Sequence, residues 1–153
     1  MITLVLALLL SGPIDGQAST QKSSAPAAKS AVEKVTVYRS RTCGCCGKWV
    51  QHMRDNGFEV VEHIVERMEN APNRDRVPAK LQSCHVATVR GYVVEGHVPA
   101  DVVKDMLKKQ PQIEGIAVPG MPAGSPGMES PTPEPYDVIA FTKEGKSWVF
   151  AKR

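Results

Sequence analysis

Three of the four cysteines in this chain lie within four residues, in the segment Cys43-Gly44-Cys45-Cys46. The cluster follows a strand-like, β-branched run and precedes a segment with helical periodicity. Cys45 and Cys46 are adjacent and cannot readily bridge each other, so a simple disulfide staple explains the cluster poorly. A thiol at the start of a helix favours the thiolate form, which is both the nucleophile of thiol–disulfide exchange and a ligand for soft metal ions. The cluster therefore predicts one of these two chemistries.

The amino-terminal sequence is typical of an export signal. Residues 1–10 form an apolar run that is too short to span a bilayer, and Gly16 and Ala18 supply the small residues of a cleavage site. We predict a signal peptide at 1–18, a flexible linker at 19–31 and a single domain at 32–153. No basic residue precedes the apolar run, so a buried amino-terminal strand is the alternative, and whether Met1 is the true start stays open.

The charge of the chain is small and dispersed. The formal net charge is +3, from 19 basic and 16 acidic side chains. No basic stripe with interleaved aromatic residues is present in the sequence, so nucleic acid is not an expected partner. After cleavage of the signal, we expect no stable insertion into a membrane.

Hydrophobic periodicity predicts the element order β-α-β-α-β-β-α up to residue 109. The predicted strands are 35–38, 58–65, 86–89 and 92–94, the longer helices are 47–56 and 99–109, and one or two short helices fall within 66–83. The first helix is a short crossover, so the strands before and after it should be parallel. Arg90-Gly91 is a two-residue hairpin turn. With cysteines at the first strand–helix junction, this order indicates an α/β, thioredoxin-like fold with a central mixed sheet flanked by helices.

The carboxy-terminal third begins with a segment that is rich in proline and glycine, residues 111–135. Such a composition predicts a long loop without regular structure. The segments 136–141 and 147–151 then alternate around a turn, which predicts a terminal β-hairpin. Trp148 and Phe150 share one face of that hairpin and are expected to cover the core.

In the predicted arrangement, the segment before the central hairpin lies beside the first strand–helix turn, which brings Cys84 and His85 to the cysteine cluster. Four thiolates can hold zinc, an iron–sulfur cluster or copper(I). The single C-x-x-C pair argues against zinc, and export argues against an iron–sulfur cluster, so copper is favoured. Two alternatives remain open: thiol–disulfide exchange through Cys43 and Cys46, and a structural disulfide such as Cys46 with Cys84.

Histidines and methionines extend the predicted site. His52 lies two helical turns after Cys45, and His97 opens the final helix, where capping or loop packing is its alternative role. Met121 and Met128 are thioethers in the proline-rich loop that could pass copper to the site or fill gaps in the core. The predicted metal-site residues are Cys43, Cys45, Cys46, Cys84, His52, His85, His97, Met121 and Met128. Met53, Met106 and Trp49 are expected in the core.

Several of these stretches together resemble the CopG family of periplasmic copper-resistance proteins, formerly a domain of unknown function. The matching stretches are Cys43 to Cys46 with Trp49 and His52, Leu81 to His85, Glu95 to Pro99, and Gly115 to Glu129. They extend over nearly all of the predicted mature chain. In combination they are far more specific than the three clustered cysteines alone.

The resemblance implies a thioredoxin-like fold and copper bound as a multinuclear cluster by Cys43, Cys45, Cys46 and Cys84. The expected function is copper resistance and homeostasis in the periplasm: the protein would bind copper(I) and shift it between oxidation states before efflux components receive it. Whether this makes the protein a copper oxidoreductase or a metal-binding protein stays open. The competing hypothesis is a thiol–disulfide oxidoreductase that uses Cys43 and Cys46.

Overall fold

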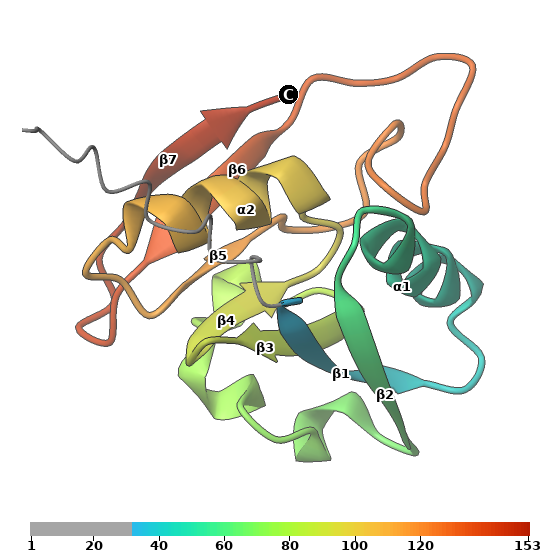
Figure 1. Cartoon of the computed structure of the whole chain (residues 1–153), viewed down its shortest axis with the longest axis horizontal. Helices are drawn as coiled ribbons and strands as arrows, with labels where there is room; N and C mark the ends of the chain where they lie inside the picture. The colour runs from blue at the N-terminus through green and yellow to red at the C-terminus, as the bar shows by residue number, and fades with distance from the viewer. Residues whose placement is uncertain (1–31) are drawn as a thin grey trace, which may run out of the picture. The chain divides into compact units, whose positions relative to one another are not determined.

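A computed structural model describes residues 32–153, and the predicted signal peptide and linker lie outside the described residues. Within this range seven strands form one mixed sheet in the order β2-β1-β3-β4-β5-β6-β7 (Figure 1). The strands are β1 (Lys34–Ser40), β2 (Glu59–Val65), β3 (His85–Val89), β4 (Tyr92–Glu95), β5 (Gly115–Ala117), β6 (Asp137–Phe141) and β7 (Ser147–Lys152). The helices are α1 (Gly44–Asp55) and α2 (Ala100–Lys109). The predicted mixed α/β architecture is confirmed.

The βαβ unit at the start of the domain is confirmed, with β1 and β2 parallel. Helix α1 begins at Gly44, three residues before the predicted start, and Cys43 is its N-cap. The cysteine cluster therefore forms the first turn of the helix itself. Gly57 follows the end of α1 as expected, with a positive φ of 85° and its N–H donating to the Arg54 carbonyl at 2.9 Å.

The central hairpin and the second helix also form as predicted. Strands β3 and β4 are antiparallel, and both turn residues have positive φ, 47° at Arg90 and 84° at Gly91, as a type I′ turn requires. Pro99 precedes α2, and Gln110 ends the helix in the left-handed region.

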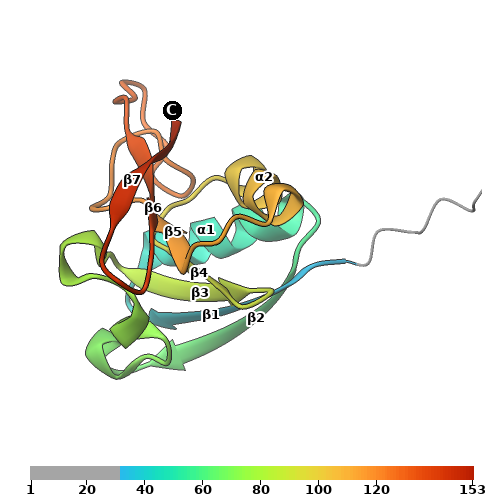
Figure 2. The same cartoon turned by 90° about the vertical axis from the view of Figure 1, so that its left-hand side faces the viewer.

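Side chains alternate between the two faces of the sheet, and a different set of elements packs against each face. Trp49 and Met53 of α1 and Met106 of α2 are fully buried in one cluster, which confirms their predicted place in the core. Figure 2 shows both helices on this side of β1, β3 and β4. The other face is covered by the segment that contains Val77 and Leu81. In that segment the expected short helices are three single 3₁₀ turns, Met68–Asn70, Arg74–Arg76 and Ala79–Leu81.

The proline-rich segment contains a strand, so the prediction that 111–135 lacks regular structure is wrong. Strand β5 pairs parallel with β4 and antiparallel with β6, and its three residues are buried. Three residues are enough to form this strand, because β4 on one side and β6 on the other supply its hydrogen-bond partners. Pattern analysis misses a strand this short, because periodicity needs a longer run to be visible.

The terminal hairpin of β6 and β7 is confirmed. Of the two aromatic residues that were predicted to cover the core, only Phe150 does so. The pairing jumps from Ile139 with Val149 to Val138 with Ala151, so Phe150 is the extra residue of a β-bulge. A bulge breaks the two-residue alternation. Phe150 packs against the core, whereas Trp148 is 46% exposed.

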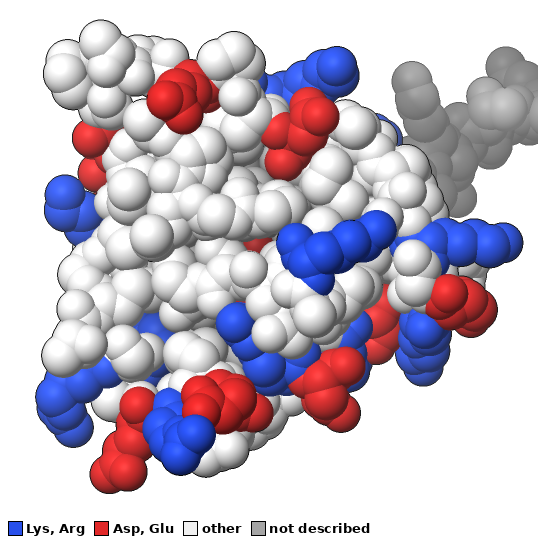
Figure 3. Space-filling view, turned by 180° about the vertical axis from the view of Figure 1, so that it is seen from behind, with Lys and Arg blue, Asp and Glu red and all other residues white. Residues whose placement is uncertain are grey.

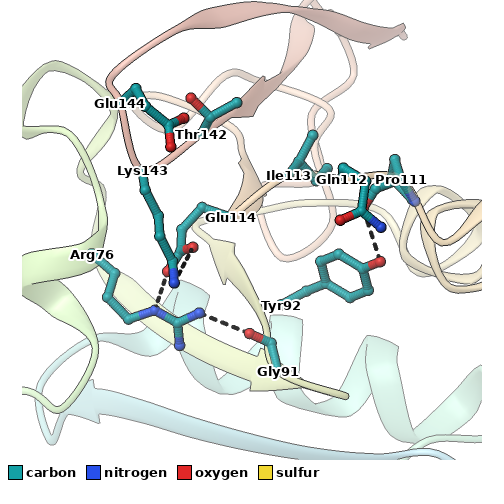
Figure 4. Close-up of a pocket in the computed structure, with 10 residues that line it drawn as sticks. All are labelled: Arg76, Gly91, Tyr92, Pro111, Gln112, Ile113, Glu114, Thr142, Lys143 and Glu144. Carbon is teal, nitrogen blue, oxygen red and sulfur yellow. Dashed lines mark hydrogen bonds and ion pairs between the residues drawn. The ribbon is translucent and has the colours of Figure 1, made fainter.

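Arg76 ties the 3₁₀ segment to the sheet. Its guanidinium forms an ion pair with Glu114, which precedes β5, and donates to the Gly91 carbonyl at 2.8 Å. These residues line a polar cavity of about 490 Å³ that Lys143 also borders (Figure 4).

On the face of the molecule in Figure 3, basic and acidic side chains are interspersed. Within residues 32–153, none of the helices has the length and apolar character needed to cross a bilayer.

We predict that Gly115→Ala destabilises the domain by about 1–3 kcal/mol, the usual cost of overpacking. A Cβ atom at Gly115 would lie 2.2 Å from the Val93 carbonyl oxygen and 2.9 Å from a ring carbon of Phe141. The matched control is Gly44→Ala, because Gly44 is helical and has nothing within 4 Å of the added Cβ. Urea unfolding measures both variants, and equal stabilities would contradict the tight approach of β4 to β5.

Candidate metal centre

The sheet register brings the fourth cysteine to the other three. Strands β1 and β3 are antiparallel with Arg39 opposite His85, so Cys84 lies beside the end of β1, from which the chain turns into α1. The four Sγ atoms of Cys43, Cys45, Cys46 and Cys84 all lie within 4.8 Å of one another. The predicted convergence of four sulfur atoms is therefore present.

Two of these sulfurs are joined in the structure. Cys43 and Cys46 form a disulfide across the first turn of α1, and Cys45 and Cys84 are free thiols. The alternative pairing of Cys46 with Cys84 is wrong for this structure, in which the Cys46 sulfur instead lies 3.6 Å from the Cys84 carbonyl oxygen. Only after reduction would four thiolates be available at once.

His97 faces Cys84 with an unprotonated ring nitrogen. Its Nδ1 lies 2.8 Å from the Pro126 carbonyl oxygen, which can only accept, so Nδ1 carries the proton. Burial lowers the pKa of His97, which favours the neutral ring. Its Nε2 then accepts a hydrogen bond from the Cys84 thiol, whose sulfur lies 3.0 Å away. A histidine with one nitrogen fixed by a carbonyl and the other unprotonated has the arrangement of a metal ligand.

His85 completes a second group of potential ligands with Cys84 and His97, whose ligand atoms also lie within 4.8 Å of one another. Its Nδ1 is 3.4 Å from the Cys84 sulfur, and its ring packs against Trp49 at 4.4 Å between ring centroids. His85 is fully buried, and its Nε2 has no hydrogen-bond partner. Desolvation, together with neighbouring His97, holds the pKa of His85 well below its usual range.

His52 lies apart from both groups. Its Nε2 accepts the backbone N–H of Ala100 at 3.0 Å, so it satisfies one of the amides at the start of α2. Burial lowers the pKa of His52, which suits an accepting, neutral ring. A direct role in metal binding stays a prediction for this residue.

The proline-rich loop packs against one side of the cluster. Gly127 packs so closely that an added Cβ would lie 2.5 Å from the Cys45 carbonyl oxygen. The Met121 sulfur lies 3.9 Å from the Cys45 sulfur, and Met121 is 53% exposed. Met128 is half-buried and lines, with Cys45, an open cavity of about 550 Å³. The loop therefore brings both predicted methionines to the side of the cluster where Cys45 lies.

A buried ion pair beside the cluster was not predicted from the sequence. Glu95 is fully buried at the end of β4 and pairs with Arg74 of the second 3₁₀ turn. Burial raises the pKa of Glu95 to about 7, although the guanidinium and the Ser83 N–H oppose the shift. The one available signal was an acidic residue directly after the apolar run of β4. The same two side chains hold the peptide of Ser83, which precedes Cys84.

These features define a class: a mixed α/β protein with a cysteine–histidine cluster that can hold a metal ion at the start of its first helix. Burial raises the pKa of the Cys84 thiol to about 11, so a metal ion would have to displace its proton.

Comparison with known proteins identifies the family. A family model described as a protein of unknown function, DUF411, matches residues 81–128. A solved structure of copper resistance protein CopG, form 2, is 39% identical, with a TM-score of 0.75, and the match covers 80% of this chain and 99% of that one. Form 1 of the same protein matches with 39% identity, a TM-score of 0.74 and coverage of 80% and 98%. A search of curated protein sequences found no significant match. The chain belongs to the CopG family.

We predict that the metal-free protein loses stability as the pH falls below about 6.5, the usual pKa of histidine. The folded state keeps His85 neutral, whereas the unfolded chain takes up its proton near the ordinary value of 6.5. The unfolded state then binds more protons, so the unfolding free energy falls, by up to about 1.4 kcal/mol per pH unit for a fully buried ring. His52 and His97 act in the same direction.

Glu95 opposes this trend, because its pKa is raised from 4.5 to about 7 and the folded state binds the extra proton between those values. The variant Glu95→Gln should therefore lose stability more steeply with falling pH than the unmodified protein. Urea unfolding from about pH 7 to about pH 5 measures both slopes. A flat profile in both proteins would contradict the assignment of buried neutral histidines.

Proposed function

We propose that this protein binds copper(I) through the thiolates of Cys43, Cys45, Cys46 and Cys84 and serves copper resistance. The observation that carries the proposal is the convergence of the four sulfur atoms within 4.8 Å of one another. Thiolates are soft ligands that favour copper(I). The similarity to two structures of a copper resistance protein supports copper over other soft metals.

The side chains next to the four sulfur atoms can also bind copper(I). The lone pair of His97 faces the Cys84 sulfur, and the thioether of Met121 lies next to Cys45. Imidazole and thioether both bind copper. With four sulfurs so close, one thiolate can bridge two ions, so we propose a multinuclear copper cluster with His85 and His97 at its buried side and the methionines at its open side.

The cellular setting is part of the proposal. The apolar run at 1–10 and the small residues at 16 and 18 support export to the periplasm. There the protein would hold copper(I) until efflux components receive it. The βαβ unit with cysteines at its first turn, followed by a hairpin and a helix, supports a thioredoxin-like relationship for residues 34–109.

A redox role for the bound copper extends the proposal. A sulfur-bridged cluster can exchange an electron with little rearrangement, and the fixed positions of Cys84 and His97 would keep that rearrangement small. The copper-loaded protein should change its visible absorption under a mild oxidant and recover under a mild reductant. An unchanged spectrum under both treatments would remove the redox role and leave the binding role.

We predict that Cys45→Ser and His97→Asn each lower the copper(I) affinity of the reduced protein by about 10-fold to 100-fold, the range seen for groups that hold or orient metal ligands. His63→Asn is the matched control, because His63 is exposed on β2 and stacks on Tyr38 at 5.0 Å between ring centroids. Competition with a copper(I) chelator, with elemental analysis and thiol counting, measures the effect. Equal affinities in all three variants would contradict the proposed site.

A second function is favoured by one observation, the disulfide between Cys43 and Cys46 across the first turn of α1. A C-x-x-C disulfide at a helix N-terminus is the arrangement of a thiol–disulfide oxidoreductase. Such an enzyme should reduce insulin disulfides and should tolerate Cys45→Ser. A dedicated copper protein should be nearly inactive in that assay, so insulin reduction by the Cys45→Ser variant at the unmodified rate would favour the second function.

A further inference from the structure

We propose that Ser83 is a positioning residue that holds Met121 over Cys45 and thereby completes the open side of the copper site. This inference rests on the proposed copper function. The hydrogen bond that carries it runs from the Ser83 hydroxyl to the Gly120 carbonyl oxygen at 2.7 Å. Met121 follows directly, and its sulfur lies 3.9 Å from the Cys45 sulfur.

The backbone of Ser83 is fixed from two sides. Its N–H donates to the Glu95 carboxylate, and its carbonyl oxygen accepts from the Arg74 guanidinium at 2.8 Å. Arg74 and Glu95 also pair with each other, which closes a ring of three contacts around the backbone of one residue, Ser83. Glu95 is fully buried and the Arg74 side chain is 12% exposed, so little water competes for these contacts.

The side chain of Ser83 is confined as well. Gly96 has φ of 70°, and an added Cβ there would lie 2.8 Å from the Ser83 Cβ and 2.6 Å from the Val118 carbonyl oxygen. Gly96, the residue after β4, therefore packs closely against both Ser83 and Val118, the residue after β5. With the backbone fixed and the side chain enclosed on this flank, the hydroxyl is directed at Gly120.

The packing around Met121 does not hold its side chain as firmly as Ser83 is held. Met121 is 53% exposed, and the Cys45 side chain that it contacts is only half-buried. A long, flexible thioether on an exposed loop samples several rotamers, and each costs entropy to fix. The Ser83 hydrogen bond fixes the peptide before Met121, so less of that cost falls on copper binding. Ser83 thus couples the Cys84 segment to the methionine that faces Cys45.

The test is a double-mutant cycle on the reduced full chain, with copper(I) affinity measured by competition with a chelator. Ser83→Ala should weaken binding by about twofold to fivefold, the effect of one exposed hydrogen bond. Met121→Leu keeps the volume but removes the thioether, and should weaken binding at least as much. In the Met121→Leu background, Ser83→Ala should have no further effect, because the group that Ser83 positions is already absent.

The conservative variant Ser83→Thr keeps the hydroxyl and should retain the affinity. A second readout needs no copper: in protein labelled at its methionine methyl groups, Ser83→Ala should shift and sharpen the Met121 resonance in NMR spectra, while the buried Met53 and Met106 resonances stay in place. Urea unfolding checks that the variants fold.

Additive losses in the double variant would overturn the inference, since Ser83 would then act elsewhere, for example through its contact with the Cys84 sulfur at 3.9 Å. An unchanged affinity and an unchanged Met121 resonance in Ser83→Ala would overturn it too. Failure of the proposed function is a distinct result: the unmodified reduced protein would then not bind copper(I) with its cysteines.

Discussion

The site depends on the antiparallel pairing of β1 with β3. Because Arg39 lies opposite His85, the start of β3 meets the end of β1, where the chain turns into α1. A shift of this register by one residue would place His85 on the opposite face of the sheet and away from Trp49. Two segments about forty residues apart in the sequence thus contribute one cluster, and the pairing of β1 with β3 sets their separation.

The surroundings of Cys84 show how the fold supports that cluster. Strand alternation directs Glu95 to the face covered by the 3₁₀ turns, where it meets Arg74, and the pair holds the peptide before Cys84. On the other side, the Pro126 carbonyl fixes the tautomer of His97. The sulfur of Cys84 is therefore placed by a buried ion pair and faced by an oriented imidazole. A site prepared in this way loses little entropy when it binds an ion.

Sequence patterns were sufficient for most of the regular elements and for the convergence of the four cysteines. The βαβ unit, the Arg90-Gly91 hairpin and α2 have strong periodicity or turn chemistry, and the clustered cysteines are visible at once. Cys84 could be placed because the element order implied its neighbours. Strand β5 could not be predicted, because its three residues owe their conformation to β4 and β6 rather than to their own pattern. The bulge at Phe150 depends on pairing in the same way.

The redox state of the cysteines was also beyond sequence analysis, since Cys43 and Cys46 can serve either as two thiolates or as one disulfide. X-ray absorption at the copper edge of the reduced, copper(I)-loaded protein tests the account most directly. We predict a first coordination shell dominated by sulfur, with a smaller nitrogen contribution that decreases in His97→Asn. A shell made mainly of nitrogen and oxygen would contradict the proposal that four cysteines hold the copper.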